Sequence, residues 1–87
     1  MIKERIYDER GNFVGVIVET GAVYNANGEY VGWINPVTGG VFNSKGEFKG
    51  GKFGDSYYSI NTGFIGTNRA AAIRELLGLK TDNESFI

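Results

Sequence analysis

The stretch VYNANGEYVG, Val23 to Gly32, decides the fold of this chain, because nearly the same ten letters occur again elsewhere. IYDERGNFVG begins at Ile6, VFNSKGEFKG begins at Val41, and a weaker copy, YYSINTGFIG, begins at Tyr57. A segment that recurs at a nearly constant spacing encodes one structural unit several times. The sequence therefore predicts a protein built from four copies of one unit.

Each unit contains the signature of a tight β-hairpin. In VYNANGEYVG, Asn25 opens the turn NANG and Gly28 closes it. An Asn or Asp side chain at the first turn position accepts hydrogen bonds from the backbone amides that follow, and glycine adopts the positive φ that ends a type I turn in a bulged hairpin. The first and third copies carry DERG and NSKG here, whereas the fourth has its glycine one position late, at Gly63. We expect four hairpins, the last with a shifted turn.

Two aromatic residues flank each turn and are predicted to face each other across the hairpin. With a three-residue loop, Tyr24 lies opposite Tyr30 on one face of the ribbon, and Val23 lies opposite Val31 on the other face. The equivalent aromatic pairs are Tyr7/Phe13, Phe42/Phe48 and Tyr58/Phe64. The second face is mixed, because Lys49 stands at the position equivalent to Val31. We therefore expect the aromatic face to form the core.

A glycine follows the second aromatic residue of every copy by two positions. These residues are Gly15, Gly32, Gly50 and Gly66. Glycine inside a strand marks a place where a neighbouring ring or backbone approaches closely. A single hairpin is marginally stable in water, so the four hairpins must share one core. They do so either as a meandering sheet or as petals around a pseudo-fourfold axis.

The residues after the fourth hairpin switch from strand-like alternation to helical spacing. The segment TNRAAAIRELL, residues 67–77, carries apolar residues at helical intervals, namely Ala70, Ile73, Leu76 and Leu77. This spacing predicts a helix with Thr67 or Asn68 as its N-cap and Gly78 as its stop. Its apolar stripe is expected to plug one open end of the hairpin array.

The chain is long enough for one domain. Eighty-seven residues can enclose one small core, which we place over residues 1–80. The expected organisation is mainly β, with hairpin units at about 6–22, 23–40, 41–56 and 57–66 and a short C-terminal helix at 67–77. The last letters, LKTDNESFI, begin at Leu79 and read as a polar extension, with residues 81–87 as a tail.

Composition removes several classes of function. The chain has no cysteine and no histidine, so disulfides, zinc-type sites, thiol nucleophiles and imidazole bases are not expected, and neither is a cofactor. A formal net charge of -1 argues against a nucleic-acid partner and against a membrane surface. The first ten letters, MIKERIYDER, lack the apolar stretch of a signal peptide. A cytoplasmic location is expected.

The repeat resembles a known family. The recurrence of aromatic-Asx-x-x-Gly-x-aromatic-x-Gly, followed by a short helix, is similar to the small bacterial proteins grouped as the 4-fold beta flower family, over roughly Ile6 to Leu77. This resemblance implies four β-hairpins arranged like petals, and it implies no established activity. The hairpin repeats of bacterial cell-wall-binding modules also combine glycine with aromatic residues, but they are richer in tryptophan than this chain, which has only Trp33.

Two candidate sites lie where the copies stop matching. At the turn into the helix, unpaired backbone amides and a partial positive charge favour a nucleotide or another anion, with Thr67, Asn68 and Arg69 assisting. A plain capped helix is the alternative there. Trp33 stands where the other units have small or β-branched residues, so it is a candidate for a ligand pocket, a protein partner or a homo-oligomer contact. The alternative is that it fills space beside Pro36.

Lysines gather in GGVFNSKGEFKGGKFG, which contains Lys45, Lys49 and Lys52. They are interpreted either as a phosphate or nucleic-acid surface or as charges that prevent strand edges from pairing, and the second interpretation is favoured. The acidic candidates for a catalytic pair are Asp8, Glu9, Glu19, Glu29, Glu47 and Asp55. No spacing among them indicates a hydrolase. The sequence favours a non-enzymatic binding or protein-interaction module, with a small-anion-binding protein as the alternative.

Overall fold

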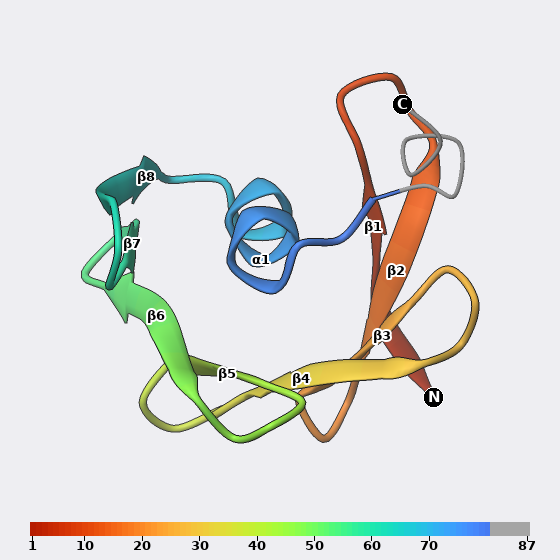
Figure 1. Ribbon diagram of the computed structural model, residues 1–87, viewed down its shortest axis with the longest axis horizontal. Coiled ribbons are helices and arrows are strands. Elements are labelled where there is room, and N and C mark those ends of the chain that lie inside the picture. The colour runs from red at the N-terminus through yellow and green to blue at the C-terminus, as the bar shows by residue number, and fades with distance from the viewer. Residues whose placement is uncertain (81–87) are drawn as a thin grey trace.

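The computed structural model describes residues 1–80, which form eight antiparallel strands and one helix (Figure 1). The elements are β1 (Ile2–Tyr7), β2 (Phe13–Val18), β3 (Ala22–Asn25), β4 (Tyr30–Ile34), β5 (Gly40–Asn43), β6 (Phe48–Phe53), β7 (Ser56–Ser59), β8 (Gly63–Gly66) and α1 (Arg69–Leu77). The predicted mainly β class is confirmed. The first strand begins before the expected unit boundary at residue 6, and the tail expected at 81–87 lies outside the described residues.

The strands pair in chain order, from β1 to β8, in a single sheet. This sheet curls around α1, so that hairpins 1 to 4 (β1–β2, β3–β4, β5–β6 and β7–β8) surround the helix (Figure 1). The sequence left two arrangements open, and the structure combines them. The strands pair in chain order as a meandering sheet, and the curl of this sheet arranges the hairpins as petals.

Turn chemistry forms the hairpins as predicted. In hairpin 2, Asn25 Oδ1 accepts hydrogen bonds from the amides of Asn27 (3.0 Å) and Glu29 (2.9 Å), and Gly28 has a φ of 83°. In hairpin 4 the positive-φ glycine is Gly63, one position later, and a serine replaces Asx. The four aromatic pairs lie opposite each other as expected, namely Tyr7/Phe13, Tyr24/Tyr30, Phe42/Phe48 and Tyr58/Phe64.

The register beyond each aromatic pair differs from the prediction by one residue. Val23 is paired with Gly32 and not with Val31, because the second strand of the hairpin carries a bulge between Tyr30 and Gly32. The corresponding residues in the other hairpins are Val14, Lys49 and Ile65. A bulge bends its strand and increases the local twist. Four bulges at equivalent places therefore help a flat meander to curl.

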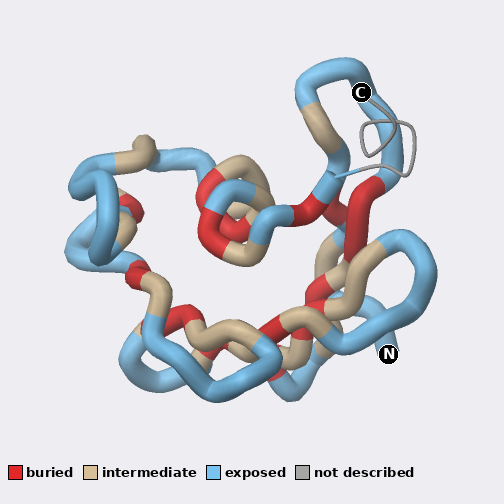
Figure 2. Tube along the Cα trace, in the orientation of Figure 1, coloured by how far each residue is buried: buried red, intermediate tan, exposed pale blue. Residues whose placement is uncertain are grey.

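The expectation that the aromatic face forms the core is wrong, because the curl turns that face outward. Val23 is fully buried, whereas Tyr30 is 47% exposed and Phe64 is 60% exposed. The core cluster is aliphatic and consists of Ile6, Val14, Ile17, Val23, Ile34, Val41, Ile73, Leu76 and Leu79, and Ala72 and Tyr57 are buried as well. Figure 2 shows the buried segments on the walls that face α1. The concave side must also hold a helix, so it has room for small aliphatic side chains and not for two rows of rings.

Strand glycines are required where one hairpin meets the next. A Cβ placed on Gly32 would overlap the carbonyl oxygen of Phe42 and would press on Leu77 of α1. At Gly15 and Gly50 the overlapping atom is again a carbonyl oxygen of the following hairpin, that of Tyr24 and that of Tyr58. Gly66, which no further hairpin follows, would meet no atom within 4 Å. The predicted close approach is therefore confirmed at three of the four glycines.

The helix fills the concave side of the sheet and does not plug one end of it (Figure 1). It begins at Arg69, because Asn68 is the N-cap and its Oδ1 accepts a hydrogen bond from the amide of Ala71 (2.9 Å). It ends at Gly78, which is left-handed with a φ of 66°. Leu79, expected in the polar extension, is instead buried in the core. The backbone amide of Gly78 donates hydrogen bonds to the last carbonyl groups of α1, and this left-handed cap turns the chain so that Leu79 reaches the core.

Candidate functional site

Two surfaces carry side chains that the core does not use. The first is the outer aromatic face, made of the outward rings Tyr7, Phe13, Tyr24, Tyr30, Trp33, Phe42, Phe48, Phe53, Tyr58 and Phe64. The second is the connection end, where residues 19–21, 35–39 and 54–55 join consecutive hairpins beside the N-terminus of α1. Each surface contains one of the sites that the sequence indicates.

Edge-to-face ring pairs explain part of the outer aromatic face. Tyr24 and Tyr30 have their ring centroids 5.9 Å apart at an interplanar angle of 66°, and the pairs of hairpins 1 and 4 have nearly the same geometry. Such pairs contribute about 0.5–1.5 kcal/mol beyond the area they bury. The repeated pairs therefore stabilise each hairpin, whether or not they touch another molecule.

Trp33 extends this surface from hairpin 2 to hairpin 3. It lies opposite Phe42 across β4 and β5, with ring centroids 6.1 Å apart and an interplanar angle of 31°. Its Nε1 donates a hydrogen bond to the carbonyl oxygen of Thr20 (2.9 Å). The residues at this position in hairpins 1 and 3 are Val16 and Gly51. The indole thus holds one connection in place and adds a ring where the repeat has none.

A cavity of about 310 Å³ lies beside this indole. This cavity is here named the Trp33 groove, and it is lined by Tyr30, Trp33, Phe42, Asn43, Ser44 and Gly46. The groove combines three rings of the outer aromatic face with the turn of hairpin 3. The Asn43 amide nitrogen already donates to Glu47 Oε1 (2.7 Å), so one polar wall is held by the turn. The groove is a largely apolar recess with a neutral rim.

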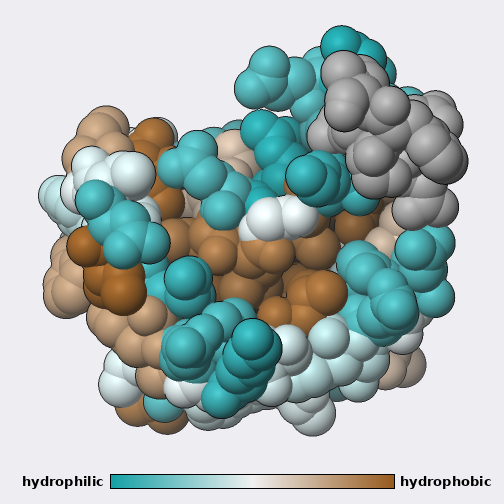
Figure 3. Space-filling model, viewed as in Figure 1, coloured by the Kyte–Doolittle hydropathy of each residue, from teal (hydrophilic) through white to brown (hydrophobic). Residues whose placement is uncertain are grey.

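A second aromatic cluster joins hairpins 3 and 4. Tyr58 contacts Phe53 and Phe64, with ring centroids 5.7 Å and 5.8 Å away. Phe53 is 66% exposed, and Ile60 in the adjoining turn is also exposed. Figure 3 shows hydrophobic residues at the left of the molecule, over β7 and β8, and others at the centre of the view. The apolar surface therefore continues along the outside of the sheet.

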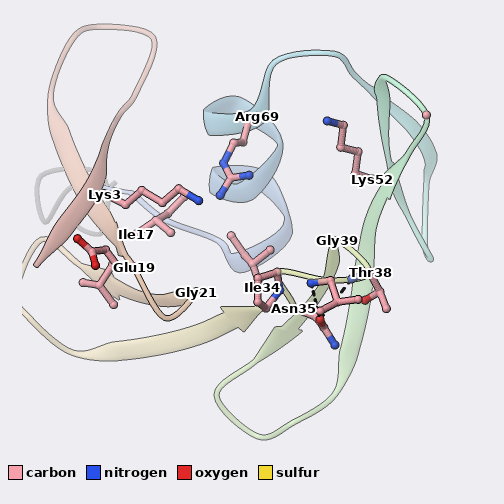
Figure 4. A pocket seen from close by; sticks show the side chains of 14 residues that line it. Lys3, Ile17, Glu19, Gly21, Ile34, Asn35, Thr38, Gly39, Lys52 and Arg69 are labelled. Atoms are coloured by element: carbon pink, nitrogen blue, oxygen red, sulfur yellow. Dashed lines mark hydrogen bonds between the residues drawn. The ribbon is translucent and has the colours of Figure 1, made fainter.

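The connection end holds a larger cavity, of about 370 Å³. Ile17 and Ile34 form part of its lining, and its cations are Lys3 of β1, Lys52 of β6 and Arg69 of α1. In Figure 4, Lys3 and Arg69 are directed to one side of this cavity and Lys52 lies across from them. Sequence reasoning singled out Arg69 but not its association with the two lysines, because strands far apart in the chain bring these charges together.

The residues proposed for the turn into the helix have separate surroundings. Thr67 is exposed and does not line the cavity at the connection end. The side-chain oxygen of Asn68 is engaged in capping α1. Arg69 lines the cavity and donates from Nε to Glu4 Oε1 (3.0 Å). The chemistry available at this end is therefore set by Arg69 with Lys3 and Lys52 more than by the backbone of the helix terminus.

Several acidic residues shape turns. Asp8 Oδ1 accepts hydrogen bonds from the amides of Arg10 and Asn12 (both 2.9 Å), and Glu29 Oε1 accepts one from the side-chain amide of Asn25 (2.8 Å). Within residues 1–80, no group of three or more acidic, histidine or cysteine residues is arranged to hold a metal ion. Nor does any helix in that range have the length and apolar character needed to cross a membrane.

Comparison with known proteins bears on the fold and not on the sites. A family model described as 4-fold beta flower protein matches residues 4–76 of the chain. Neither the curated proteins nor the solved structures contain a match. The matched segment includes hairpins 2 to 4, hairpin 1 from Glu4 onward and nearly the whole of α1.

Proposed function

Because the chain belongs to the 4-fold beta flower family, whose description names a fold, we propose its function from the chemistry of its own surfaces. We propose a non-enzymatic protein-interaction module that binds a partner through the part of the outer aromatic face on hairpins 2 and 3, with the Trp33 groove at the centre of the contact. The observation that carries this proposal is the recess formed by Tyr30, Trp33 and Phe42.

Hairpin stability does not account for this recess. Hairpin 1 carries the same kind of aromatic pair and has Val16 at the place of Trp33, so a hairpin of this repeat can be built without a third ring. Tyrosine, tryptophan and phenylalanine are enriched at protein interfaces, where large rigid side chains bury much area at a small entropic cost. The departure from the repeat therefore supports a contact role.

The chemistry of the Trp33 groove selects the kind of contact. Its walls contain rings, a serine hydroxyl and an amide, and no charged side chain. A partner that inserts an apolar or aromatic side chain would gain from burying these rings, whereas a buried charge would find no counter-ion among the lining residues. We therefore expect a protein partner or a second copy of the chain that offers an apolar anchor.

The described carboxylates support a non-enzymatic role. Asp8, Glu29 and Glu47 accept hydrogen bonds that form the hairpin turns, and each lies at the tip of a different hairpin. A catalytic carboxylate pair has to flank one bond of the substrate. These three residues are instead distributed among separate turns.

Site-specific photo-crosslinking tests the proposal. A benzophenone amino acid replaces Tyr30, which lines the Trp33 groove, and in a matched control it replaces Phe13, the equivalent residue of hairpin 1. We expect an adduct of defined mass from position 30 and none from position 13, in cells that produce the protein naturally. A mass twice that of the chain identifies a second copy, and another mass identifies a different partner.

The substitution Trp33→Val sharpens this test, because it gives hairpin 2 the residue that hairpin 1 has at this position. In a folded Trp33→Val protein, the adduct from position 30 is expected to disappear. No adduct from position 30, or equal adducts from both positions, would contradict the proposal.

A further inference from the structure

The cavity at the connection end has a chemistry different from that of the outer aromatic face. We propose that it binds a small phosphomonoester, with Lys3, Lys52 and Arg69 around the phosphate and an organic part of the ligand against Pro36 and Val37. This inference concerns a different surface from the Trp33 groove and does not depend on the interaction proposed for that groove.

Charge balance at the cavity is the first argument. Lys3 and Lys52 form no ion pair with any carboxylate of residues 1–80, and Arg69 is paired with Glu4 through Nε alone. Glu19 is the acidic residue of the lining, and in Figure 4 its carboxylate points away from Arg69 and Lys52. Two unpaired lysine charges match a phosphate dianion. The two terminal nitrogens of the Arg69 guanidinium have the geometry to bind a phosphate in a bidentate manner.

The position of these charges is the second argument. Arg69 is the first residue of α1, and the first turn of this helix contains no acidic residue. The N-terminus of a helix carries a partial positive charge that disfavours a cation. Lys3 and Lys52, which come from β1 and β6, add their charges to the same cavity. An anionic ligand would offset this accumulation of positive charge.

The apolar lining is the third argument, since it separates an organic phosphate from free phosphate. The apolar lining that a ligand can reach is Pro36 and Val37 of the β4–β5 loop, which are both exposed, whereas Ile17 is fully buried and Ile34 is 6% exposed. Asn35 Oδ1 holds this loop by accepting a hydrogen bond from the amide of Val37 (2.9 Å). The cavity of about 370 Å³ lies within the range of small-molecule sites, about 300–1,000 Å³.

NMR titration of the full chain with three probes tests the proposal. The probes are phenyl phosphate, AMP and inorganic phosphate, and the uncharged counterparts phenol and adenosine are the ligand controls. We expect saturable shifts of the amides of Asn35, Val37, Thr38 and Gly39 with at least one of the two phosphomonoesters, and weaker binding of inorganic phosphate. Phenol and adenosine should produce no saturable shift.

Matched lysine variants locate the site. Lys3→Gln and Lys52→Gln should each weaken binding about tenfold, the loss expected when a charge-assisted hydrogen bond is removed. Lys45→Gln removes the same charge at the turn of hairpin 3, outside the cavity, and should leave the affinity unchanged. Arg69 is not chosen for this test, because its ion pair with Glu4 links α1 to β1.

Each remaining outcome overturns the proposal. Absence of a saturable shift with both phosphomonoesters at millimolar concentration excludes the site. Inorganic phosphate binding as tightly as phenyl phosphate removes the role of Pro36 and Val37. An equal loss of affinity in the Lys45→Gln variant shows that the anion is held by the overall charge of the protein and not by this cavity. A crosslinking result at the Trp33 groove leaves all of these outcomes unaffected.

Discussion

The inner and outer faces of the curled sheet are built from alternating residues of the same four hairpins, yet they place opposite demands on their side chains. Val23 points inward and is fully buried, and the neighbouring Tyr24 points outward and meets Tyr30 edge to face. On the concave side, the sheet walls and α1 leave space for aliphatic residues and for glycine. On the convex side of the curl the side chains of neighbouring strands point away from one another, and large rings fit there without a clash.

This difference shows that volume, and not hydrophobicity alone, decides which face of a strongly curled sheet becomes the core. Tyrosine and phenylalanine bury more area than valine, but a concave surface that must enclose a helix is limited by the space that it offers. The rings left outside stabilise the hairpins in pairs and remain available to a partner. The two faces should therefore respond to substitution with very different losses of stability.

The largest effect is expected from Gly32→Leu, on the inner face. The new side chain would overlap the Phe42 carbonyl and Leu77, and a backbone carbonyl in a paired strand has little freedom to move. We expect a loss of at least about 3 kcal/mol in the free energy of unfolding, measured by urea denaturation. In the control Gly28→Ala, the new Cβ meets no atom within 4 Å and the loss, from the positive φ alone, should be about 1 kcal/mol. Equal losses for the two variants would refute the close approach at Gly32.

The helix side of the core is tested by Ile73→Ala. Ile73 is 1% exposed and lies among the core residues, so its truncation leaves a cavity. We expect this cavity to lower the free energy of unfolding by about 2–4 kcal/mol. The control Glu75→Ala changes an exposed residue of the same helix and should alter stability by less than about 0.5 kcal/mol. Thermal denaturation followed by circular dichroism compares the two variants. A small loss for Ile73→Ala would mean that α1 is not held inside the curl.

An intermediate effect is expected from Trp33→Val on the outer face. The change removes the hydrogen bond to Thr20 and the contact with Phe42, and we expect a loss of about 2 kcal/mol, with the fold retained. Urea denaturation measures the loss, and the amide spectrum shows whether the sheet persists. Complete unfolding would assign Trp33 to the core and remove the argument for its role in contacts.

The smallest effect is expected from Phe64→Ala. Phe64 is 60% exposed and its main contact is with the ring of Tyr58, so the loss in unfolding free energy should be at most about 1 kcal/mol. A double-mutant cycle with Tyr58→Ala should give a coupling energy of about 0.5–1 kcal/mol. A loss above about 3 kcal/mol, typical of a buried phenylalanine, would contradict the outward position of this ring.

The features of the fold that could be predicted from the sequence depend mostly on contacts between residues close together in the chain. Asn25 and Gly28 fix a turn through contacts within a few residues, and this turn sets Tyr24 opposite Tyr30. The bulge at Val31 depends on the next hairpin and on α1, which leave room for Gly32 alone at the following position. The curl of the whole sheet decides which face becomes the core, and this information is not present in any short segment of the sequence.

The candidate sites divide in the same way. Trp33 stands out in the sequence because it interrupts a repeat, and Arg69 stands out because it begins a helix. Lys3 carries no such signal, since it meets Arg69 only after the sheet has curled and brought β1 beside α1. Lys52 appeared in the sequence as one of several lysines, and pairing of β6 within the sheet distinguishes it from Lys45. Long-range topology assembles the cavity at the connection end.

The neighbouring residues Tyr57 and Tyr58 provide the most direct test of the division between the two faces. Tyr57 points inward and is 5% exposed, while Tyr58 points outward and is 37% exposed. Hydroxyl-radical footprinting with residue-level mass spectrometry measures their solvent accessibility in the folded protein. We predict rapid modification of Tyr58, together with Tyr30, and protection of Tyr57 until the protein is unfolded. Rapid modification of Tyr57 with protection of Tyr58 and Tyr30 would contradict the aliphatic core and the outer aromatic face.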